Sequence, residues 1–332
     1  MRYFLLILVT LLLFGCTAET YIQSKIPASG TFASIKIPNI SGADNRILKI
    51  SDFLDKQETV FSRFNDNGAL SNINERLKAA EVVSLDGDML KLWNAAVYLN
   101  DISDGVFDVT VSELMDEWGL YKKQSRKIPD ADKLQHILNR TGQDKLLFDP
   151  DQNTLSAKTT GITLDFNSIA KGLIVDNAVS YARGLGIDSG MIELGGDLYC
   201  LGNKNGHPWK IGIQDPLQKN KYIGALELEN MACATSGTYE NFLMIDGVRY
   251  SHMIDPRTGS PALNSVISAT VIADTCMMAD GLATILWILD KDQGMKLISK
   301  IPNAECIIVE QKGNMLLTHK SKNISKFLRR HE

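Results

Sequence analysis

The chain has 332 residues, 44% of them hydrophobic, and a formal net charge of −4 at pH 7. This length and composition allow a large core, either in one domain or in two closely associated ones. Nucleic-acid-binding domains usually carry a basic face that neutralises phosphates, so the negative charge argues against nucleic acid as a partner.

Residues 1–15, "MRYFLLILVTLLLFG", have the pattern of an export signal. One positive charge precedes an apolar run that is too short to span a bilayer as a mature helix but fits the core of a signal peptide. Leu13, Gly15 and Cys16 follow the spacing of a lipobox, in which the cysteine is diacylated and becomes the new N-terminus. Phe14 is bulkier than the residue usual in that motif. A signal peptide cut nearby without lipidation is the alternative.

Two attached acyl chains would hold the protein stably on a membrane. We therefore expect a signal peptide over residues 1–15, a lipidated Cys16 with a tether over residues 16–30, and a mature domain over residues 31–332. That domain would lie outside the cytoplasm, lipid-anchored to the inner membrane and facing the periplasm.

The other cysteines are predicted to be small buried hydrophobes. Each lies in an apolar context, with no CxxC spacing and no histidine cluster nearby, which argues against a zinc site. A disulfide bond between two of them stays open in an exported protein. These cysteines are Cys200, Cys233, Cys276 and Cys306.

The first half of the chain is predicted to contain a strand, two helices and a hairpin. "FASIKIPNI", Phe32–Ile40, alternates like a strand, and the segment around Arg46–Phe64 has the i, i+3, i+4 apolar spacing of a helix. A second helix is predicted over Asp88–Gly105, closed by its final glycine. Between Lys145 and Phe166, two short apolar segments flank "DPDQN" and indicate a hairpin.

The second half begins with a predicted helix over Asn167–Ile187, whose polar first residues, Asn167 and Ser168, can cap free N–H groups. Short strands with turns follow over Gly190–Ala273, and another helix over Met277–Leu289. Strands clustered between helices, without regular βαβ alternation, predict an α+β fold with antiparallel sheets and packed helices.

"TLDFNSIAKG", Thr163–Gly172, leads from a strand into a helix start with Lys171 in its first turns. A helix N-terminus presents unpaired N–H groups and the positive end of the helix dipole, so a phosphate can dock there. A capped helix with a solvated lysine is the alternative that this stretch alone favours.

"MMADGLATIL", Met277–Leu286, carries two hard oxygen donors, Asp280 and Thr284, one helical turn apart on the same face. Such a pair facing a phosphate would suit Mg²⁺, which takes few protein ligands. Alternatively, the threonine bonds its own i−4 carbonyl and the aspartate faces water. The apolar flanks imply burial and weaken that alternative, because a buried unpaired carboxylate is costly.

Two further stretches leave both interpretations open. In "GVFDVTVSELMDEWG", Asp108 and Thr110 lie on one side of a strand-like segment and could hold an adenine or ribose, or could cap the following helical turn. In "MACATSGTYENF", the hydroxyls and glycine of Thr235–Thr238 could form a nest for an anionic group or a simple turn between strands.

His252 precedes a turn, Asp255–Gly259, that needs no imidazole. Proline fixes φ, aspartate bonds its own backbone and glycine takes a positive φ. This histidine, one of five in the chain, therefore requires a different explanation.

Taken together and in order, these motifs resemble the FAD:protein FMN transferase (ApbE) family over nearly all of the mature chain. The motifs that carry the resemblance are "GTFASI", "FSRFNDNGALSNIN", "FDVTVSELMDEWG", "LDFNSIAKG", "ELGGDL", "WKIGIQDP", "ATSGTYENF", "YSHMIDPRTGSP" and "MMADGLAT". The resemblance implies two intimately associated lobes with a core like the tunnelling fold, and FAD bound between them.

The resemblance also implies roles for single positions. Asp280, Thr284 and the backbone carbonyl of Ala170 match the family's Mg²⁺ ligands, and His252 matches its essential histidine. With Lys171 and Thr235, which the local patterns indicate, the expected contacts to the flavin dinucleotide are Ser29, Phe64, Val106, Phe107, Asp108, Asn167, Lys171, Thr235 and Ile254.

The implied activity is Mg²⁺-dependent transfer of FMN from FAD to a threonine hydroxyl of an acceptor protein, with release of AMP. The resemblance gives as acceptors subunits of membrane redox complexes such as sodium-pumping NADH:quinone oxidoreductase. The imidazole of His252 would serve either as general base or as a group that orients the diphosphate.

Two departures keep other functions open. Many family members have methionine where this chain has Ser29, and a hydroxylated aromatic residue where it has Phe64. The resemblance also includes related proteins that differ in this region and are Mg²⁺-dependent FAD pyrophosphatases, which release FMN and AMP. A non-catalytic FAD-binding lipoprotein is the third possibility, although a pure carrier needs no metal beside the pyrophosphate.

Overall fold

The computed structural model describes residues 20–28, 30–120, 128–218, 220–237, 242–245, 247–251, 253–262, 264–313 and 315–329. The predicted signal peptide, Cys16, Ser29 and His252 lie outside these ranges. In the described part of the chain, no helix combines the length and the hydropathy needed to cross a membrane.

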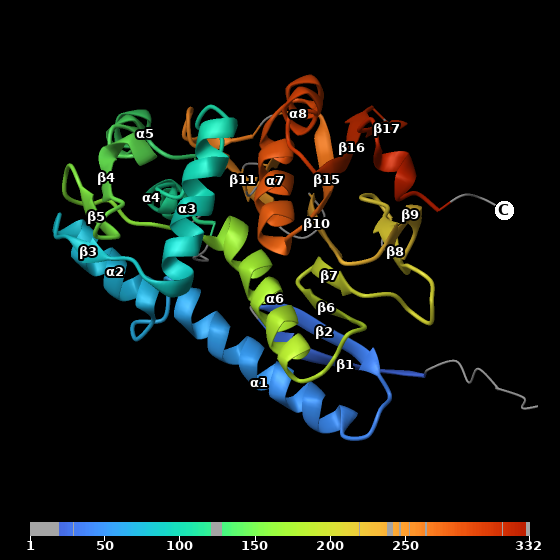
Figure 1. The fold of residues 1–332 in the computed structure, drawn as a ribbon. Helices are drawn as coiled ribbons and strands as arrows, with labels where there is room; N and C mark the ends of the chain where they lie inside the picture. Colours follow the sequence, from blue (N-terminus) through green and yellow to red (C-terminus); the bar gives the residue numbers. More distant parts are fainter. Residues whose placement is uncertain are drawn as a thin grey trace, which may run out of the picture.

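An eight-stranded antiparallel sheet forms the centre of the molecule (Figure 1). Each strand pairs antiparallel with its neighbours, including strands far apart in sequence such as β2 and β6. In spatial order the strands are β1 (Tyr21–Ala28), β2 (Thr31–Pro38), β6 (Gly190–Leu194), β7 (Asp197–Leu201), β10 (Met231–Gly237), β15 (Val266–Ala273), β16 (Glu305–Lys312) and β17 (Met315–Lys320).

Both faces of this sheet are covered. In β15 every residue is buried, and its side chains divide between two apolar clusters, with Val271 and Ala273 in the main core and Ile267 and Ile272 in a second one. A mostly apolar sequence such as VISATVIA is expected of a strand buried on both faces. The second cluster lies under the hairpin of β8 (Trp209–Gln214) and β9 (Tyr222–Leu228).

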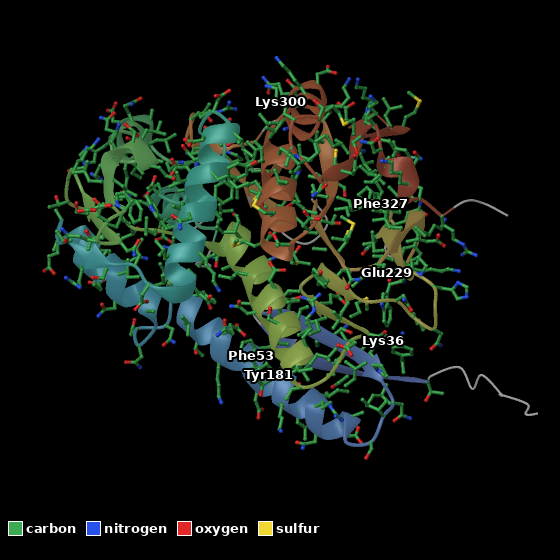
Figure 2. All side chains as sticks on the ribbon, viewed as in Figure 1. Lys36, Phe53, Tyr181, Glu229, Lys300 and Phe327 are labelled. Carbon is green, nitrogen blue, oxygen red and sulfur yellow. The ribbon has the colours of Figure 1, made fainter. Side chains whose placement is uncertain are left out.

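The helices α1 (Ala43–Phe61), α6 (Asn167–Gly184) and α7 (Cys276–Ile288) cover the other face. The rings of Phe53 in α1 and Tyr181 in α6 stack with their centroids 4.6 Å apart (Figure 2). The short α8 (Lys291–Ile298) follows α7 and packs against it and β16.

A smaller group of elements lies beside the large sheet, on the left in Figure 1. It contains α2 (Ala69–Lys78), α3 (Gly87–Ile102), α4 (Ser112–Glu117), α5 (Ala131–Leu138) and a three-stranded sheet of β3 (Val83–Ser84), β5 (Thr154–Ala157) and β4 (Leu146–Asp149). One apolar cluster runs through both groups, from Leu92 and Leu155 to Val271. Two short hairpins complete the fold: β11 (Phe242–Ile245) with β12 (Val248–Ser251), and β13 (Ile254–Asp255) with β14 (Ser260–Pro261).

The predicted α+β class with antiparallel sheets is confirmed. The hairpin around "DPDQN" is β4–β5, and the helix predicted to close at Gly105 is α3, which ends at Ile102. Gly105 has a φ of 78° and its N–H donates to the carbonyl of Asn100, as expected of a glycine that ends a helix. The helix predicted around Arg46–Phe64 is α1, which begins and ends three residues earlier.

Two predictions about local structure are wrong, and one strand was not predicted. The side chains of Asn167 and Ser168 do not cap α6; the backbone N–H of Asn167 donates instead to Oδ1 of Asp165. The segment around Asp108 is a series of turns and not a strand. The strand β1, Tyr21–Ala28, was not predicted from the sequence.

The four described cysteines are all buried and free, which confirms their prediction as small hydrophobes. No disulfide bond forms among them. Burial raises the pKa of the thiols of Cys233 and Cys306 to about 12, so these groups stay protonated at neutral pH.

Helices α6 and α7 cross at very short range. At Gly172 in α6, an added Cβ would lie 2.4 Å from the carbonyl oxygen of Cys276 and 2.5 Å from Cα of Met277. One turn later, Asp176 accepts hydrogen bonds from the backbone N–H groups of Cys276 at 2.8 Å and Met277 at 2.9 Å. The first turn of α7 is therefore held directly on α6.

We expect Gly172→Ala to destabilise the fold by about 1–3 kcal/mol or more, because the methyl group would meet backbone atoms that cannot rotate away. Gly184→Ala is the matched control, since the same helix has nothing within 4 Å of that position. Urea unfolding of both variants checks this. Equal stability of the two would contradict the close crossing.

Burial raises the pKa of Asp176 from 3.8 to about 6, against the lowering effect of the two N–H donors. Because the folded state holds this proton more tightly, the contribution of Asp176 to stability is full below pH 3.8 and is lost as the pH rises through about 6. Asp176→Asn should remove this pH dependence. Urea unfolding of both proteins across this window, without divalent cations, measures it; a difference in stability that is independent of pH would contradict it.

Candidate functional site

A cavity of about 660 Å³ opens where α1, α6 and α7 meet the ends of β7 and β10. This volume lies within the range of small-molecule sites. Many of its lining residues are polar, and seven were predicted as site residues. Those seven are Phe64, Asn167, Ala170, Lys171, Thr235, Asp280 and Thr284.

Asp280 and Thr284 lie on the face of α7 that lines the cavity, and only 4% and 5% of their surfaces are exposed. Oδ2 of Asp280 accepts the backbone N–H of Gly172 at 3.2 Å. The hydroxyl of Thr284 makes no hydrogen bond within the described part of the chain, so the back-bonded alternative is not found. The pair offers a carboxylate and a hydroxyl to the same space.

Lys171 lies between two buried carboxylates. Its Nζ forms an ion pair with Oδ2 of Asp197 and lies 4.0 Å from Oδ1 of Asp280. Burial lowers the pKa of Lys171, but the charges of Asp197 and Asp280 outweigh this and raise it. About a third of its side chain is exposed (34%), but the ammonium is ion-paired and is not the fully solvated group considered from the sequence.

The charges of this group favour an additional cation. Burial raises the pKa of both Asp197 and Asp280, although Lys171 opposes the increase. When both carboxylates are ionised, one ammonium leaves an excess negative charge in a desolvated place. No cluster of three or more His, Cys, Asp or Glu side chains that could hold a metal occurs among the described residues. The donors here are instead one carboxylate and one hydroxyl, hard oxygens that fit Mg²⁺, and Ala170 lines the same cavity.

The N-terminus of α6 forms another wall. Asn167 and Ser168 line the cavity, and Asp165 holds the first turn by accepting the N–H of Asn167 at 2.9 Å. The positive end of an 18-residue helix thus lies beside the ammonium of Lys171. This combination attracts a phosphate group.

The wall formed by β10 contains Thr235, Ser236 and Gly237, part of the predicted nest. Oγ1 of Thr235 lies 2.9 Å from Oγ1 of Thr270 in the neighbouring strand. Across the cavity, 53% of the surface of Phe64 is exposed. The last residue of the predicted nest, Thr238, lies outside the described residues.

Four residues expected to contact the dinucleotide do not line this cavity. Val106 and Phe107 belong to the main apolar core, and Ile254 packs in a smaller cluster with Leu114 and Trp118. Asp108 is also buried. Its carboxylate accepts the N–H and hydroxyl of Thr110 at 2.7 and 2.6 Å and the N–H of Gln143 at 2.9 Å. Of its two possible roles, the structure supports the one within the turn.

Sequence reasoning missed Asp197, which lies at the start of β7 and is buried against Lys171. The signal was present in "ELGGDL": Gly195 and Gly196 both have positive φ, and they turn the chain so that an acidic residue begins a buried strand. Glu58, Met115 and Met253 also line the cavity, and no local pattern marks them.

The model of the ApbE family matches residues 29–308. The FAD:protein FMN transferase of Vibrio cholerae is 34% identical over 304 residues, which cover 89% of this chain and 90% of the relative. The FAD:protein FMN transferase of Haemophilus influenzae is 32% identical over 75% of this chain and 73% of its own length.

Solved structures agree with these matches. The flavin transferase ApbE from Vibrio cholerae has a TM-score of 0.83 and 30% identity, covering 93% of this chain and 100% of that one. The ApbE protein from Thermotoga maritima has a TM-score of 0.85 and 29% identity, covering 94% of this chain and 100% of that one. On its sequence, its fold and the extent of these matches, the chain belongs to the ApbE family.

Proposed function

We propose that this protein is an FAD:protein FMN transferase that depends on Mg²⁺, joins FMN to a threonine hydroxyl of an acceptor protein and releases AMP. The observation that carries the proposal is the buried pair Asp280 and Thr284, which faces the cavity beside Lys171 and the start of α6. The relatives of this chain, which are named FAD:protein FMN transferase, support the flavin-transfer part.

The diphosphate of FAD would bind where positive charge converges. The N–H groups at the start of α6 and the ammonium of Lys171 face it from one side. Asp280, Thr284 and the carbonyl of Ala170 would hold Mg²⁺. When bound, the ion would withdraw charge from the diphosphate as the leaving group departs.

The reaction is a phosphoryl-type displacement. The threonine Oγ of the acceptor attacks the phosphorus of the FMN half, and a new P–O bond forms there. The bond from that phosphorus to the bridging oxygen breaks, and AMP leaves with the electron pair. We propose His252, which lies outside the described residues, as the acceptor of the threonine proton, because an imidazole titrates near neutral pH.

A second candidate, FAD pyrophosphatase, is favoured by one observation. Phe64 lines the cavity and exposes half of its surface there, but it has no hydroxyl group at a position where many family members have one. Water would then replace the acceptor threonine and free FMN would form. A protein that only carried FAD would not need the metal-binding oxygens of Asp280 and Thr284 on α7.

The test uses the chain from Thr17 onward with FAD, Mg²⁺ and an acceptor domain that carries the threonine. AMP and protein-bound flavin fluorescence are followed together. AMP with labelled acceptor identifies a transferase, AMP with free FMN identifies a pyrophosphatase, and neither product identifies a carrier.

We expect Asp280→Ala to lower AMP release by about 100-fold or more at ordinary Mg²⁺ concentration, since one of the few ligands of the cation is lost. Asp292→Ala, which removes an exposed carboxylate of α8, is the control and should be unaffected. Circular dichroism verifies that both variants fold. Normal turnover of folded Asp280→Ala would rule out this metal site.

We further propose that the protein acts at the periplasmic face of the inner membrane, anchored through diacylated Cys16, on subunits of membrane redox complexes such as sodium-pumping NADH:quinone oxidoreductase. The pattern of residues 1–16 supports the anchor.

Cys16→Ser should abolish incorporation of labelled palmitate, because the thiol that carries the first acyl chain is absent. Cell fractionation together with the label measures this. Equal labelling of the variant would contradict lipidation at this residue, and an unlabelled wild-type protein would favour the plain signal peptide.

A further inference from the structure

We propose that Arg63 is a positioning residue that fixes three walls of the cavity relative to one another and thereby sets the affinity for FAD. That the ligand is FAD rests on the proposed function, whereas the contacts of Arg63 are independent of which ligand binds. Arg63 lies in the turn after α1, between Ser62 and Phe64, which both line the cavity. Only 9% of its side chain is exposed.

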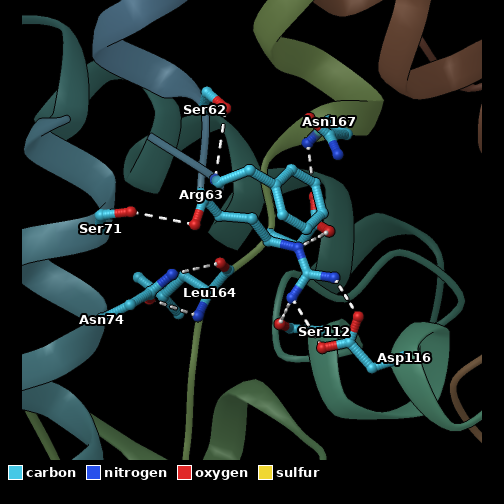
Figure 3. A network of polar contacts seen from close by, with 10 residues as sticks. Ser62, Arg63, Ser71, Asn74, Ser112, Asp116, Leu164 and Asn167 are labelled. Atoms are coloured by element: carbon cyan, nitrogen blue, oxygen red, sulfur yellow. Dashed lines mark hydrogen bonds and ion pairs between the residues drawn. The ribbon is translucent and has the colours of Figure 1, made fainter. Parts of the chain in front are cut away.

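One arm of the guanidinium reaches α4. Nη1 donates to Oγ of Ser112 at 2.7 Å and to Oδ2 of Asp116 at 3.1 Å, and Nη2 donates to Oδ1 of Asp116 at 2.6 Å (Figure 3). This fork holds both ends of a six-residue helix that has no side-chain cap. Met115, between the two contacts, lines the cavity.

The Nε atom of Arg63 lies near Asp165, just before α6. Nε of Arg63 lies 3.2 Å from Oδ2 of Asp165, and the second oxygen of that carboxylate accepts the N–H of Asn167 at 2.9 Å. Asp165 is buried, and its carboxylate holds the first N–H group of α6. A single buried ion pair therefore links the turn after α1 to the proposed phosphate-binding helix end.

The face of the guanidinium supports the next side chain. Its carbon lies 4.5 Å from the centroid of the Phe64 ring, within cation–π range. The carbonyl of Arg63 accepts the hydroxyl of Ser71 in α2 at 2.9 Å, so the backbone of this turn is also held. The exposed ring of Phe64 thus has a rigid support, although it lies in no helix or strand.

Arginine is suited to this position for a physical reason. Its planar fork serves Asp116 with two parallel hydrogen bonds while Nε stays 3.2 Å from Oδ2 of Asp165, whereas the single ammonium of lysine can serve only one carboxylate well. Complete loss of the charge would leave Asp165 buried without its partner and endanger the fold. A conservative variant is therefore the informative one.

The experiment compares Arg63→Lys with the wild-type chain, and Arg76→Gln is the control because Arg76 pairs with Glu81 at the surface of α2. FAD dissociation constants come from flavin fluorescence in the presence of Mg²⁺, and AMP release gives kcat and KM. We expect Arg63→Lys to raise the dissociation constant and KM at least about 10-fold while kcat changes less than about 3-fold. Arg76→Gln should match the wild type.

Two results would overturn the proposal. If Arg63→Lys unfolds more easily but binds FAD like the wild type, Arg63 only supports the fold. If kcat falls while the dissociation constant is unchanged, Arg63 acts on the reacting atoms. Should Arg63→Lys fail to fold, Asp116→Asn weakens the α4 arm alone and leaves the pair with Asp165; it should then raise the dissociation constant by a smaller factor, and an unchanged value would reject the proposal.

Hydrogen exchange separates this inference from the proposed function. Loss of amide protection in Arg63→Lys at residues 112–117 and 167–170, but not in α3, is expected whether or not FAD is the ligand. A wild-type chain that fails to bind FAD would reject the proposed function. Unchanged protection at both segments would reject the role of Arg63.

Discussion

The site depends on the close crossing of α6 and α7 at Gly172. Because no side chain separates the helices there, Gly172 can donate its N–H to Asp280, and Asp176 can hold the first turn of α7. The two oxygens on α7 and the start of α6, where we propose that phosphate binds, therefore face the same cavity. A wider crossing would separate the proposed cation site from the proposed phosphate site.

Near this crossing, the ammonium of Lys171 lies between the carboxylates of Asp197 and Asp280. Lys171 neutralises part of the charge of Asp197 and Asp280, and both carboxylates are buried enough that ionisation is costly without a partner. A divalent cation would complete the balance, and the hydroxyl of Thr284, which makes no hydrogen bond within the described residues, faces the same cavity. The cost of burying two ionised carboxylates and the proposed chemistry both favour a divalent cation at this place.

The opposite side of the cavity is organised by Arg63 and its contacts (Figure 3). Here the walls belong to short or irregular segments, namely the turn after α1, the six-residue α4 and the first turn of α6. Such segments have little intrinsic stability, so polar contacts must supply the order that helix packing supplies at Gly172. The cavity is thus held on one side by backbone packing and on the other by a buried guanidinium.

The sequence by itself determined the fold class, most element positions and the placing of Asp280 and Thr284 on one helix face, because these follow from periodicity and from spacing within one helix. The motifs showed the resemblance to the family. The sequence did not determine that Asp108 completes a turn, that Asp165 accepts the first N–H of α6, or that Asp197 pairs with Lys171. Those outcomes depend on which segments far apart in the chain meet. Local sequence patterns do not predict such long-range contacts. Only the tertiary structure decides which residue pairs with a buried charge.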